Sequence, residues 1–413
     1  MTIIYTTLTR VLAMAASFLV LLISARAFGA EGRGTVAATV SLATLIGTLG
    51  SLSVGRVIIF RIVQAGMHPQ DYHRRALSTI LGVFLALSVL SAIAAMVIVR
   101  FRPGLVGGLT APYLFMAVLM VPYFAWAQLG SQLFASLDLL TRQNVILLVN
   151  RAMLLLVAVI LIAGPGLTLL QFVGVLTLFN LGGVAAECVL LLRSVRPHWR
   201  WDAGVSREVI RDGLLLHIDT VGGFVLASTN VLVLNYFLSP SDVGVYEMAS
   251  TLIGIFALLP LVVQLRINTI IARDGVDGAW TTQRRLIHRT LLVVAAGALA
   301  SLVVVPLGLR WLGRGYEASI TVYSLLLLTL PGNALAMLMG PQWIARGYLR
   351  TASLLTVATG VLGLTASIVL VPRLGVRGVV WSSIFSYGIA LLLNLLFYRF
   401  VDTRASCPAP AVA

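Results

Sequence analysis

One kind of positive charge is missing from this sequence. Its 413 residues contain no lysine, so all 29 basic residues are arginines, set against 14 acidic residues. Charged residues make up only 10% of the chain, whereas soluble domains carry about 25%. Together with a hydrophobic content of 59%, this scarcity excludes an ordinary soluble domain and indicates a polytopic membrane protein.

Cysteine and the common catalytic motifs are scarce or missing as well. The only cysteines, Cys188 and Cys407, are far apart in the chain, which argues against a disulfide framework or a metal site. The sequence has no GxxxxGK[ST] phosphate loop, so nucleotide hydrolysis by that route is excluded. No connection between apolar runs is long enough for a catalytic domain. We therefore expect neither an enzyme nor a bound cofactor or metal.

Long apolar runs fill most of the chain. Runs of at least about 18 residues can cross a bilayer as helices, and twelve such runs predict an all-α membrane fold. Prolines 122, 260, 306 and 331 are expected to bend the helices that contain them. The twelve runs lie at about 9–28, 35–60, 77–99, 112–137, 144–163, 168–192, 213–238, 243–265, 287–309, 318–340, 351–371 and 376–398.

The arginines predict both orientation and partners. They are spread among the apolar runs rather than gathered in one basic domain, which argues against nucleic acid as a partner. Most of them fall on the cytoplasmic side if the N-terminus is cytoplasmic, as the positive-inside rule requires. We therefore predict that both termini are cytoplasmic and that the arginines contact membrane lipid or an anionic substrate.

The stretch RAFGAEGRG, residues 26–34, separates the first two apolar runs. Its glycines predict a chain reversal, and Glu31 is expected to favour the N-terminus of the next helix. Residues 28–42 can be aligned weakly with 238–252, which occupy the corresponding position between runs seven and eight. This repeat predicts two six-helix bundles, 1–200 and 201–413, an arrangement common among transporters.

Charged residues within or beside membrane spans are functional candidates, because placing a charge in the bilayer costs free energy. Arg10, Arg56, Arg151 and Arg266 are of this kind. One interpretation is that such side chains extend to the cytoplasmic interface. The other is that they form a cationic vestibule that binds substrate.

Four titratable residues are candidates for ion coupling: His217, Asp219, Glu187 and Glu247. Histidine titrates near neutral pH, and burial raises the pKa of a carboxyl group toward that range. Capping, or salt bridges near the membrane surface, is the structural alternative for these groups. Asn230 and Asn235 are candidate substrate-binding amides, although buried amides commonly hold membrane helices together.

Four segments resemble polysaccharide flippases of the multidrug and oligosaccharidyl-lipid exporter superfamily. They are ARAFGAEGRGTVAATVSLATLIGTLG (25–50), NVLVLNYFLSPSDVGVYEMASTLIGIFALLP (230–260), WLGRGYEASITVYSLLLLTLPG (311–332) and LVPRLGVRGVVWSSIFSY (370–387). The resemblance implies a MATE-like fold with two six-helix bundles around a central cavity, and alternating access without ATP. The chain departs from the family at Asn230, where many members carry Asp.

The resemblance also implies a function. It predicts a flippase that moves undecaprenyl-pyrophosphate-linked oligosaccharide from the inner to the outer leaflet of a bacterial cytoplasmic membrane. Such a protein would serve the synthesis of lipopolysaccharide O-antigen, capsule or exopolysaccharide, with a polysaccharide polymerase among its candidate partners. Two alternatives remain open: a cation-coupled multidrug exporter of the same superfamily, and a non-transporting scaffold in a glycan-assembly complex.

Overall fold

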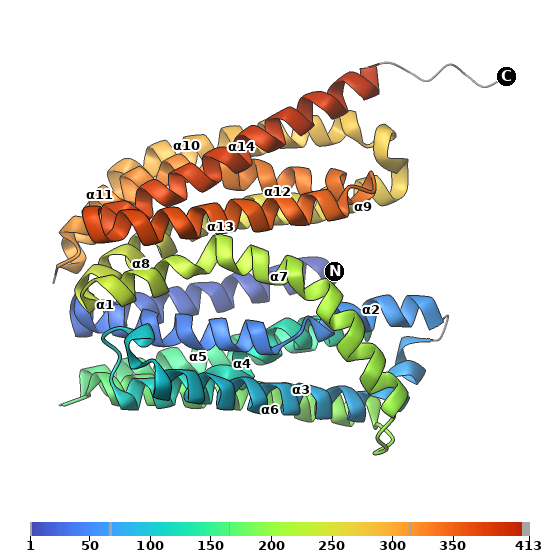
Figure 1. Cartoon of the computed structure of the whole chain (residues 1–413), viewed down its shortest axis with the longest axis horizontal. Coiled ribbons are helices and arrows are strands. Elements are labelled where there is room, and N and C mark those ends of the chain that lie inside the picture. Colours follow the sequence, from blue (N-terminus) through green and yellow to red (C-terminus); the bar gives the residue numbers. More distant parts are fainter. Residues whose placement is uncertain (1, 66–67, 165, 314, 407–413) are drawn as a thin grey trace. The chain divides into compact units, whose positions relative to one another are not determined.

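The computed structural model describes residues 2–65, 68–164, 166–313 and 315–406, without the side chains of 2–7, 56, 59–60, 63–65, 215–216, 218–219, 226–228, 349 and 404–406. All regular structure in these ranges is helical (Figure 1). The helices are α1 (Thr2–Gly50), α2 (Val54–Ala65), α3 (Pro69–Phe101), η1 (Pro103–Val106), α4 (Ala111–Ser136), α5 (Leu140–Ala163), α6 (Leu169–Val195), α7 (Ala203–Phe237), α8 (Pro240–Ile255), α9 (Leu258–Gly278), α10 (Trp280–Leu312), α11 (Glu317–Leu326), η2 (Leu327–Thr329), α12 (Leu330–Ala345), α13 (Leu349–Leu374) and α14 (Val376–Ser406).

The helices account for the twelve predicted spans. Among the searched residues, 10 segments are long and apolar enough to cross a membrane. The first of these, Leu8–Gly50, contains two predicted spans because its helix breaks at Gly29, where φ is 66°. The 10 segments thus contain eleven of the predicted spans, and the remaining one, 213–238, lies in α7, which is not among them. The protein is therefore a multi-pass membrane protein with an all-helical fold.

At two of the four prolines where a bend is predicted, the α-helix is broken, and the chemistry of proline explains why. Pro260 and Pro331 lack an N–H, so the carbonyls of Phe256 and Leu327 lose their usual helical donors. The chain leaves the α-helix at Phe256–Ala257 and again in the 3-10 turn η2, where the Leu330 N–H donates to the Leu327 carbonyl instead. The helix continues without a break through Pro122 in α4 and Pro306 in α10, and the bend expected at these two residues stays a prediction.

An unexpected break separates α1 from α2. Leu52 and Ser53 adopt positive φ angles of 42° and 51°, a conformation that costs a non-glycine residue about 1 kcal/mol or more. The Val54 N–H donates to the Ser51 carbonyl at 3.1 Å and closes the turn. The predicted span 35–60 is therefore divided here, and the chain continues as α2.

By its internal contacts the chain divides into two compact units. The N-terminal unit contains Met1–Phe224 and Ser239–Ser241, and the C-terminal unit contains Val225–Leu238 and Asp242–Ala413. The predicted boundary between bundles at residues 200 and 201 stays a prediction, since the units divide within α7.

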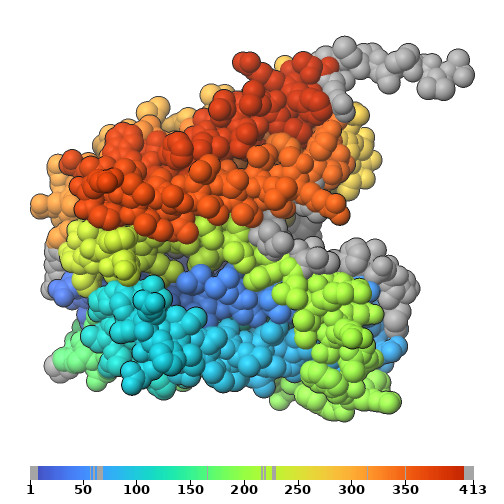
Figure 2. All heavy atoms as spheres, in the orientation of Figure 1, coloured from blue at the N-terminus to red at the C-terminus, as the bar shows by residue number. Residues whose placement is uncertain are grey.

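Each unit has its own packing. In the N-terminal unit, apolar cores form around Ile58, Leu77 and Leu133 and around Val20, Met120 and Phe172. In the C-terminal unit, a core forms around Ile267, Leu335 and Met339. The antiparallel pair α13 and α14 packs most extensively, and its side chains cover one continuous face of that unit in orange and red (Figure 2).

Candidate functional site: charged and hydroxyl clusters within the two units

The guanidinium group of Arg151 is held by neutral partners inside the N-terminal unit. Arg151, on α5, donates from Nη2 to the Tyr123 hydroxyl at 2.5 Å and from Nη1 to the Asn180 amide oxygen at 3.2 Å. Its Cζ atom lies 5.8 Å from the centroid of the Tyr123 ring, within range of a cation–π interaction. No described carboxylate is within ion-pair distance of Arg151, so its positive charge is oriented but not neutralised.

The carboxylate of Glu187 is held in the same manner. Glu187, on α6, is buried, and its Oε2 accepts hydrogen bonds from the Trp126 indole N–H at 2.7 Å and the Gln143 amide at 2.9 Å. Among the described side chains, no cation pairs with it. Both bonds come from neutral donors, so this carboxylate is also ordered without compensation of its charge.

Helical periodicity explains why these groups meet between three helices. Tyr123 and Trp126 are three residues apart on α4, and Asn180 and Glu187 are seven apart on α6, spacings that keep side chains on one helical face. α4 packs against both α5 and α6, and α5 packs against α6. We call the six residues Tyr123, Trp126, Gln143, Arg151, Asn180 and Glu187 the polar ladder.

A second polar cluster joins the α1–α2 break to α7 within the same unit. The Ser53 hydroxyl lies 2.7 Å from that of Thr220 and 3.2 Å from Nδ1 of His217. Further along α2, Arg61 forms ion pairs with Asp212 and, at 3.4 Å, with Glu208. His217 therefore contacts a strained turn, and the charge of Arg61 is compensated by carboxylates, unlike that of Arg151.

The N-terminus of α7 is capped by Asp202, just outside the helix. Its Oδ1 accepts hydrogen bonds from the backbone N–H groups of Val205 and Gly204 at 3.2 and 3.0 Å. Oδ2 accepts another from Arg75 at 3.2 Å. The Val205 N–H, followed by Arg75 and Gly204, holds the pKa of the Asp202 carboxyl below its usual range, although partial desolvation opposes the shift.

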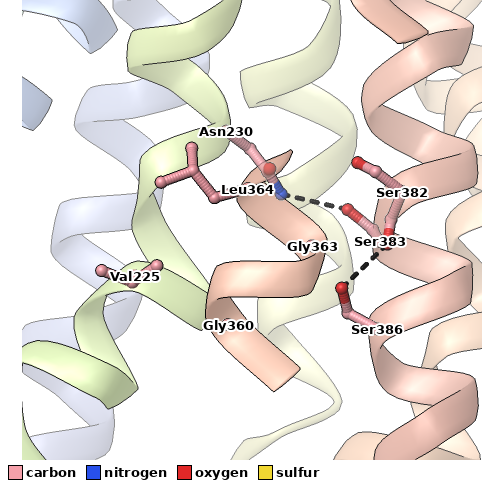
Figure 3. A pocket seen from close by; sticks show the side chains of 8 residues that line it. All are labelled: Val225, Asn230, Gly360, Gly363, Leu364, Ser382, Ser383 and Ser386. Atoms are coloured by element: carbon pink, nitrogen blue, oxygen red, sulfur yellow. Dashed lines mark hydrogen bonds between the residues drawn. The ribbon is translucent and has the colours of Figure 1, made fainter. Parts of the chain in front are cut away.

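In the C-terminal unit, Asn230 is the centre of an uncharged cluster (Figure 3). Its amide donates to the hydroxyls of Tyr246 and Ser383, each at 3.0 Å, and its carbonyl oxygen accepts from Ser367 at 3.3 Å. Ser367 in turn lies 2.5 Å from the hydroxyl of Ser382. We call these five residues the hydroxyl cluster. It connects α7, α8, α13 and α14, which favours the helix-clamping interpretation of Asn230.

A small polar cavity adjoins this cluster. Its empty volume accessible to a water-sized molecule is about 10 Å³, close to the minimum for one water. Figure 3 shows Ser383 bonded to Asn230 and Ser386 bonded to Ser382 of its own helix, with Gly360 and Gly363 on the α13 side. These groups are all neutral, so the cavity suits a water molecule better than an ion.

The other candidates are dispersed. Arg10 and Arg266 are exposed on α1 and α9. Asn235 is buried in α7, and Glu247 on α8 accepts a hydrogen bond from Thr251 at 3.2 Å. The side chains of Arg56 and Asp219 lie outside the described residues. Where the structure is described, no group of three or more metal-ligating side chains could hold a metal ion.

Sequence reasoning missed the partners of the charged groups. Tyr123, Trp126 and Gln143 lie in apolar helices and become functional candidates only when α4, α5 and α6 pack together. The serine pair at 382–383 was a visible signal, because serine hydroxyls in a span can hydrogen-bond across helices. The serine pair alone does not identify α7, α8 and α13 as the helices that the cluster connects to α14.

Comparison with solved structures defines the fold. An inward-facing multidrug resistance MATE family transporter of the MOP superfamily matches with a TM-score of 0.74 and 14% identity, over 97% of this chain and 100% of that one. The lipid II flippase MurJ in an inward closed conformation matches with a TM-score of 0.73 and 12% identity, over 98% and 90% of the chains.

A MOP superfamily transporter from Pyrococcus furiosus, described as having a binding pocket of reverse polarity, matches with a TM-score of 0.59 and 12% identity, over 98% of this chain and 96% of that one. No protein family and no curated protein matches this chain by sequence. At these identities the similarity establishes the fold, which is the MATE-like, all-α fold of MOP-superfamily transporters.

Proposed function

We propose that this protein is a flippase for an anionic lipid-linked oligosaccharide, of the undecaprenyl-pyrophosphate type. It would act by alternating access in a bacterial cytoplasmic membrane, with both termini in the cytoplasm, and would serve cell-surface polysaccharide synthesis. Its fold is shared with a lipid II flippase, MurJ. In this proposal, residues 1–200 and 201–413 form the two six-helix bundles that alternate.

The chemistry of such a cargo requires a cationic route. A pyrophosphate-linked sugar carries about two negative charges, and hydrocarbon does not accommodate unpaired charge. Arginine suits the task because it remains charged and forms paired hydrogen bonds with phosphate oxygens. Moving two negative charges outward down an inside-negative potential releases about 5 kcal/mol at 100 mV. The potential could therefore drive export without ATP.

The observation that carries the proposal is the state of Arg151. Its guanidinium is ordered by Tyr123 and Asn180 but keeps its net charge, because both partners are neutral. Such a group is preorganised to bind an anion. Arg10 and Arg266 are exposed and, with Arg56, would extend this cationic surface into a vestibule. Asn235 and Asn230 would contribute amides to sugar hydroxyls.

A second candidate function rests on Glu187. A buried carboxylate without a described cationic partner is suited to binding a proton or cation, as a cation-coupled multidrug exporter requires. His217, Asp219 and Glu247 would be further coupling groups. In this alternative the cargo is cationic and Glu187, rather than Arg151, is the essential residue.

A matched pair of substitutions on α5 tests the proposal. Arg151→Gln removes the oriented charge, whereas Arg142→Gln removes an exposed arginine from the same helix. A hydrogen bond to a charged group contributes about 1.5–3 kcal/mol, so we expect Arg151→Gln to slow flipping roughly 10- to 100-fold. The measurement is the rate at which full-length protein in vesicles moves a labelled undecaprenyl-pyrophosphate sugar under an applied potential.

Arg142→Gln should leave the rate unchanged, and Arg151→Lys should restore part of it by keeping the charge. Equal rates for the two glutamine variants would contradict the role of Arg151. Transport of a cationic dye that depends on Glu187 would favour the exporter. Movement of neither compound by the folded protein would favour the scaffold.

A further inference from the structure

A large apolar groove lies within the C-terminal unit, apart from the charged and hydroxyl clusters. It has a volume of about 750 Å³ and runs between α10 and the segment formed by α11, η2 and α12. This volume falls within the range of about 300–1,000 Å³ typical of ligand pockets. Its lining is almost entirely aliphatic, with Leu292, Leu299 and Leu302 on one side and Leu327 and Leu328 on the other.

Small side chains and a helix break create the groove. On α10, Ala295 and Ala298 face it, and their short side chains leave space where leucines would fill it. Opposite them, the 3-10 turn η2 and Pro331 displace the chain from a continuous helical path, because proline cannot continue the helical hydrogen bonds. The groove thus depends on the small residues of α10 and on the backbone path opposite them, and not on one side-chain rotamer.

The dimensions of the groove match one leaflet of a membrane. From Leu291 to Leu302 the lining extends about 16 Å along α10, at ~1.5 Å per residue, and half of the hydrocarbon core is ~15 Å thick. Leu292 and Leu299 are 69% and 68% exposed, so the groove opens sideways and not into a sealed interior. Its length suits an acyl chain of ordinary phospholipid and is short for a long isoprenoid chain.

Positive charge gathers at one end of the groove. His288 lines this end, and Arg285 and Arg289 lie three residues before it and one residue after it. Arg289 precedes Leu292 by three residues, a spacing that places it beside this highly exposed lining residue, at the outer edge of the groove. Both arginines are exposed, and no described carboxylate pairs with either. Asp402, the carboxylate that interacts with His288 at this end, pairs with Arg284.

We propose that this groove binds one acyl chain of an anionic glycerophospholipid, with the lipid phosphate held by Arg285 and Arg289. An apolar channel one leaflet long that ends in uncompensated arginines complements this class of lipid at both ends. The bound lipid would fill the space between α10 and α11–α12 and hold them at a fixed separation. The site does not depend on the proposed cargo or on Arg151.

Two matched pairs of variants of the full-length protein test the acyl chain and the phosphate separately. Ala295→Phe with Ala298→Phe fills the groove, whereas Ala296→Phe with Ala300→Phe adds the same bulk to the same helix at residues outside the lining. Arg285→Gln with Arg289→Gln removes the charge, and Arg310→Gln, in the last turn of α10, is its control. Native mass spectrometry would measure retention of phosphatidylglycerol, phosphatidylcholine of the same chain length, and undecaprenyl phosphate.

We expect the wild-type protein to retain phosphatidylglycerol about tenfold more strongly than phosphatidylcholine, since the first lipid is a net anion attracted by the arginines, whereas the choline group cancels the phosphate charge of the second. The filled groove should lose this retention and the doubly neutralised variant should lose the preference, while both controls behave as wild type. Equal retention by the filled and control variants would overturn the proposal, as would equal binding of the two phospholipids or displacement by undecaprenyl phosphate. Lipid retention is measured without any transport assay, so the result would test the lipid site even if the flippase proposal were wrong.

Discussion

The polar ladder of the N-terminal unit and the hydroxyl cluster of the C-terminal unit differ in the charge of the polar groups that they hold. Both place hydrogen-bonding groups among apolar helices, and both bind those groups to neutral partners. The ladder contains two ionic groups, Arg151 and Glu187, whereas the hydroxyl cluster around Asn230 contains none. Hydrogen bonds from neutral groups orient a charge without cancelling it, so only the ladder retains the capacity to attract an ion.

The neutrality of the hydroxyl cluster follows from one residue. In the family that the sequence resembles, many members carry Asp at the position of Asn230. Here the amide donates two hydrogen bonds and accepts one, which an ionised carboxylate cannot do because it only accepts. Ion coupling in this chain, if the function requires it, would therefore involve Glu187 or another acidic group.

The largest expected effect comes from removing the ladder carboxylate. Glu187→Ala would leave the buried Trp126 indole N–H and the partly buried Gln143 amide without their acceptor. Each orphaned buried donor costs about 1–3 kcal/mol, so we expect the free energy of unfolding to fall by about 3 kcal/mol. Unfolding in detergent micelles, followed by tryptophan fluorescence, would measure it.

Glu187→Gln is the matched control, because its side-chain oxygen can still accept from both donors. We expect it to keep most of the stability while losing the charge. If the alanine and glutamine variants were equally stable, the two hydrogen bonds would have no structural role and the account of the ladder would fail.

A smaller loss is expected at the hydroxyl cluster. Asn230→Leu removes three hydrogen bonds, to Tyr246, Ser383 and Ser367. Hydrogen bonds between membrane helices contribute about 0.6 kcal/mol each on average, so the expected loss is about 2 kcal/mol. The hydroxyls that remain can rotate toward one another, which is why this loss is smaller than that at Glu187. The same unfolding measurement applies.

Two serines of α14 provide the control within this cluster. Ser383 accepts from Asn230 on another helix, whereas Ser386 donates only to the Ser382 carbonyl of its own helix. Ser383→Ala should therefore destabilise the protein and Ser386→Ala should not. The reverse order would mean that the cluster does not clamp the helices together.

The sequence predicted the helices because their signal is local. Each span is a long apolar run, and Gly29, Pro260 and Pro331 mark three of the breaks by their own backbone chemistry. The break at Leu52 and Ser53 was missed because neither residue favours a positive φ. That turn is sustained by contacts with α7, which no local pattern reveals.

The candidate site was predicted only as a set of separate charges. Arg151 and Glu187 were identified because charged residues are conspicuous in apolar helices. Their partners Tyr123, Trp126 and Gln143 are ordinary side chains in membrane proteins, and only helix packing selects them. The groove beside α10 was missed for the opposite reason, since its essential residues, Ala295 and Ala298, are small and apolar.

The smallest expected effect concerns Asp202, a carboxylate outside the apolar runs. As the N-cap of α7 it accepts from the Val205 and Gly204 N–H groups, and replacement of such a cap by alanine costs about 1 kcal/mol. Water can reach these N–H groups in the Asp202→Ala variant, so the loss should be well below that of Glu187→Ala. Comparison of these two variants contrasts a carboxylate buried among helices with one whose donors water can reach.

Acid should reproduce this loss in the wild-type protein. The pKa of Asp202 is lower in the folded protein than the usual value of about 3.9 for an unfolded chain. Its stabilising contribution is therefore complete above that value and is lost as the pH falls toward the folded pKa. Asp202→Asn, which still caps the helix but does not titrate, should lack this component of the acid dependence in unfolding curves measured between about pH 6 and 3. An acid profile identical to that of the wild type would show that the ionisation of Asp202 does not stabilise the folded protein.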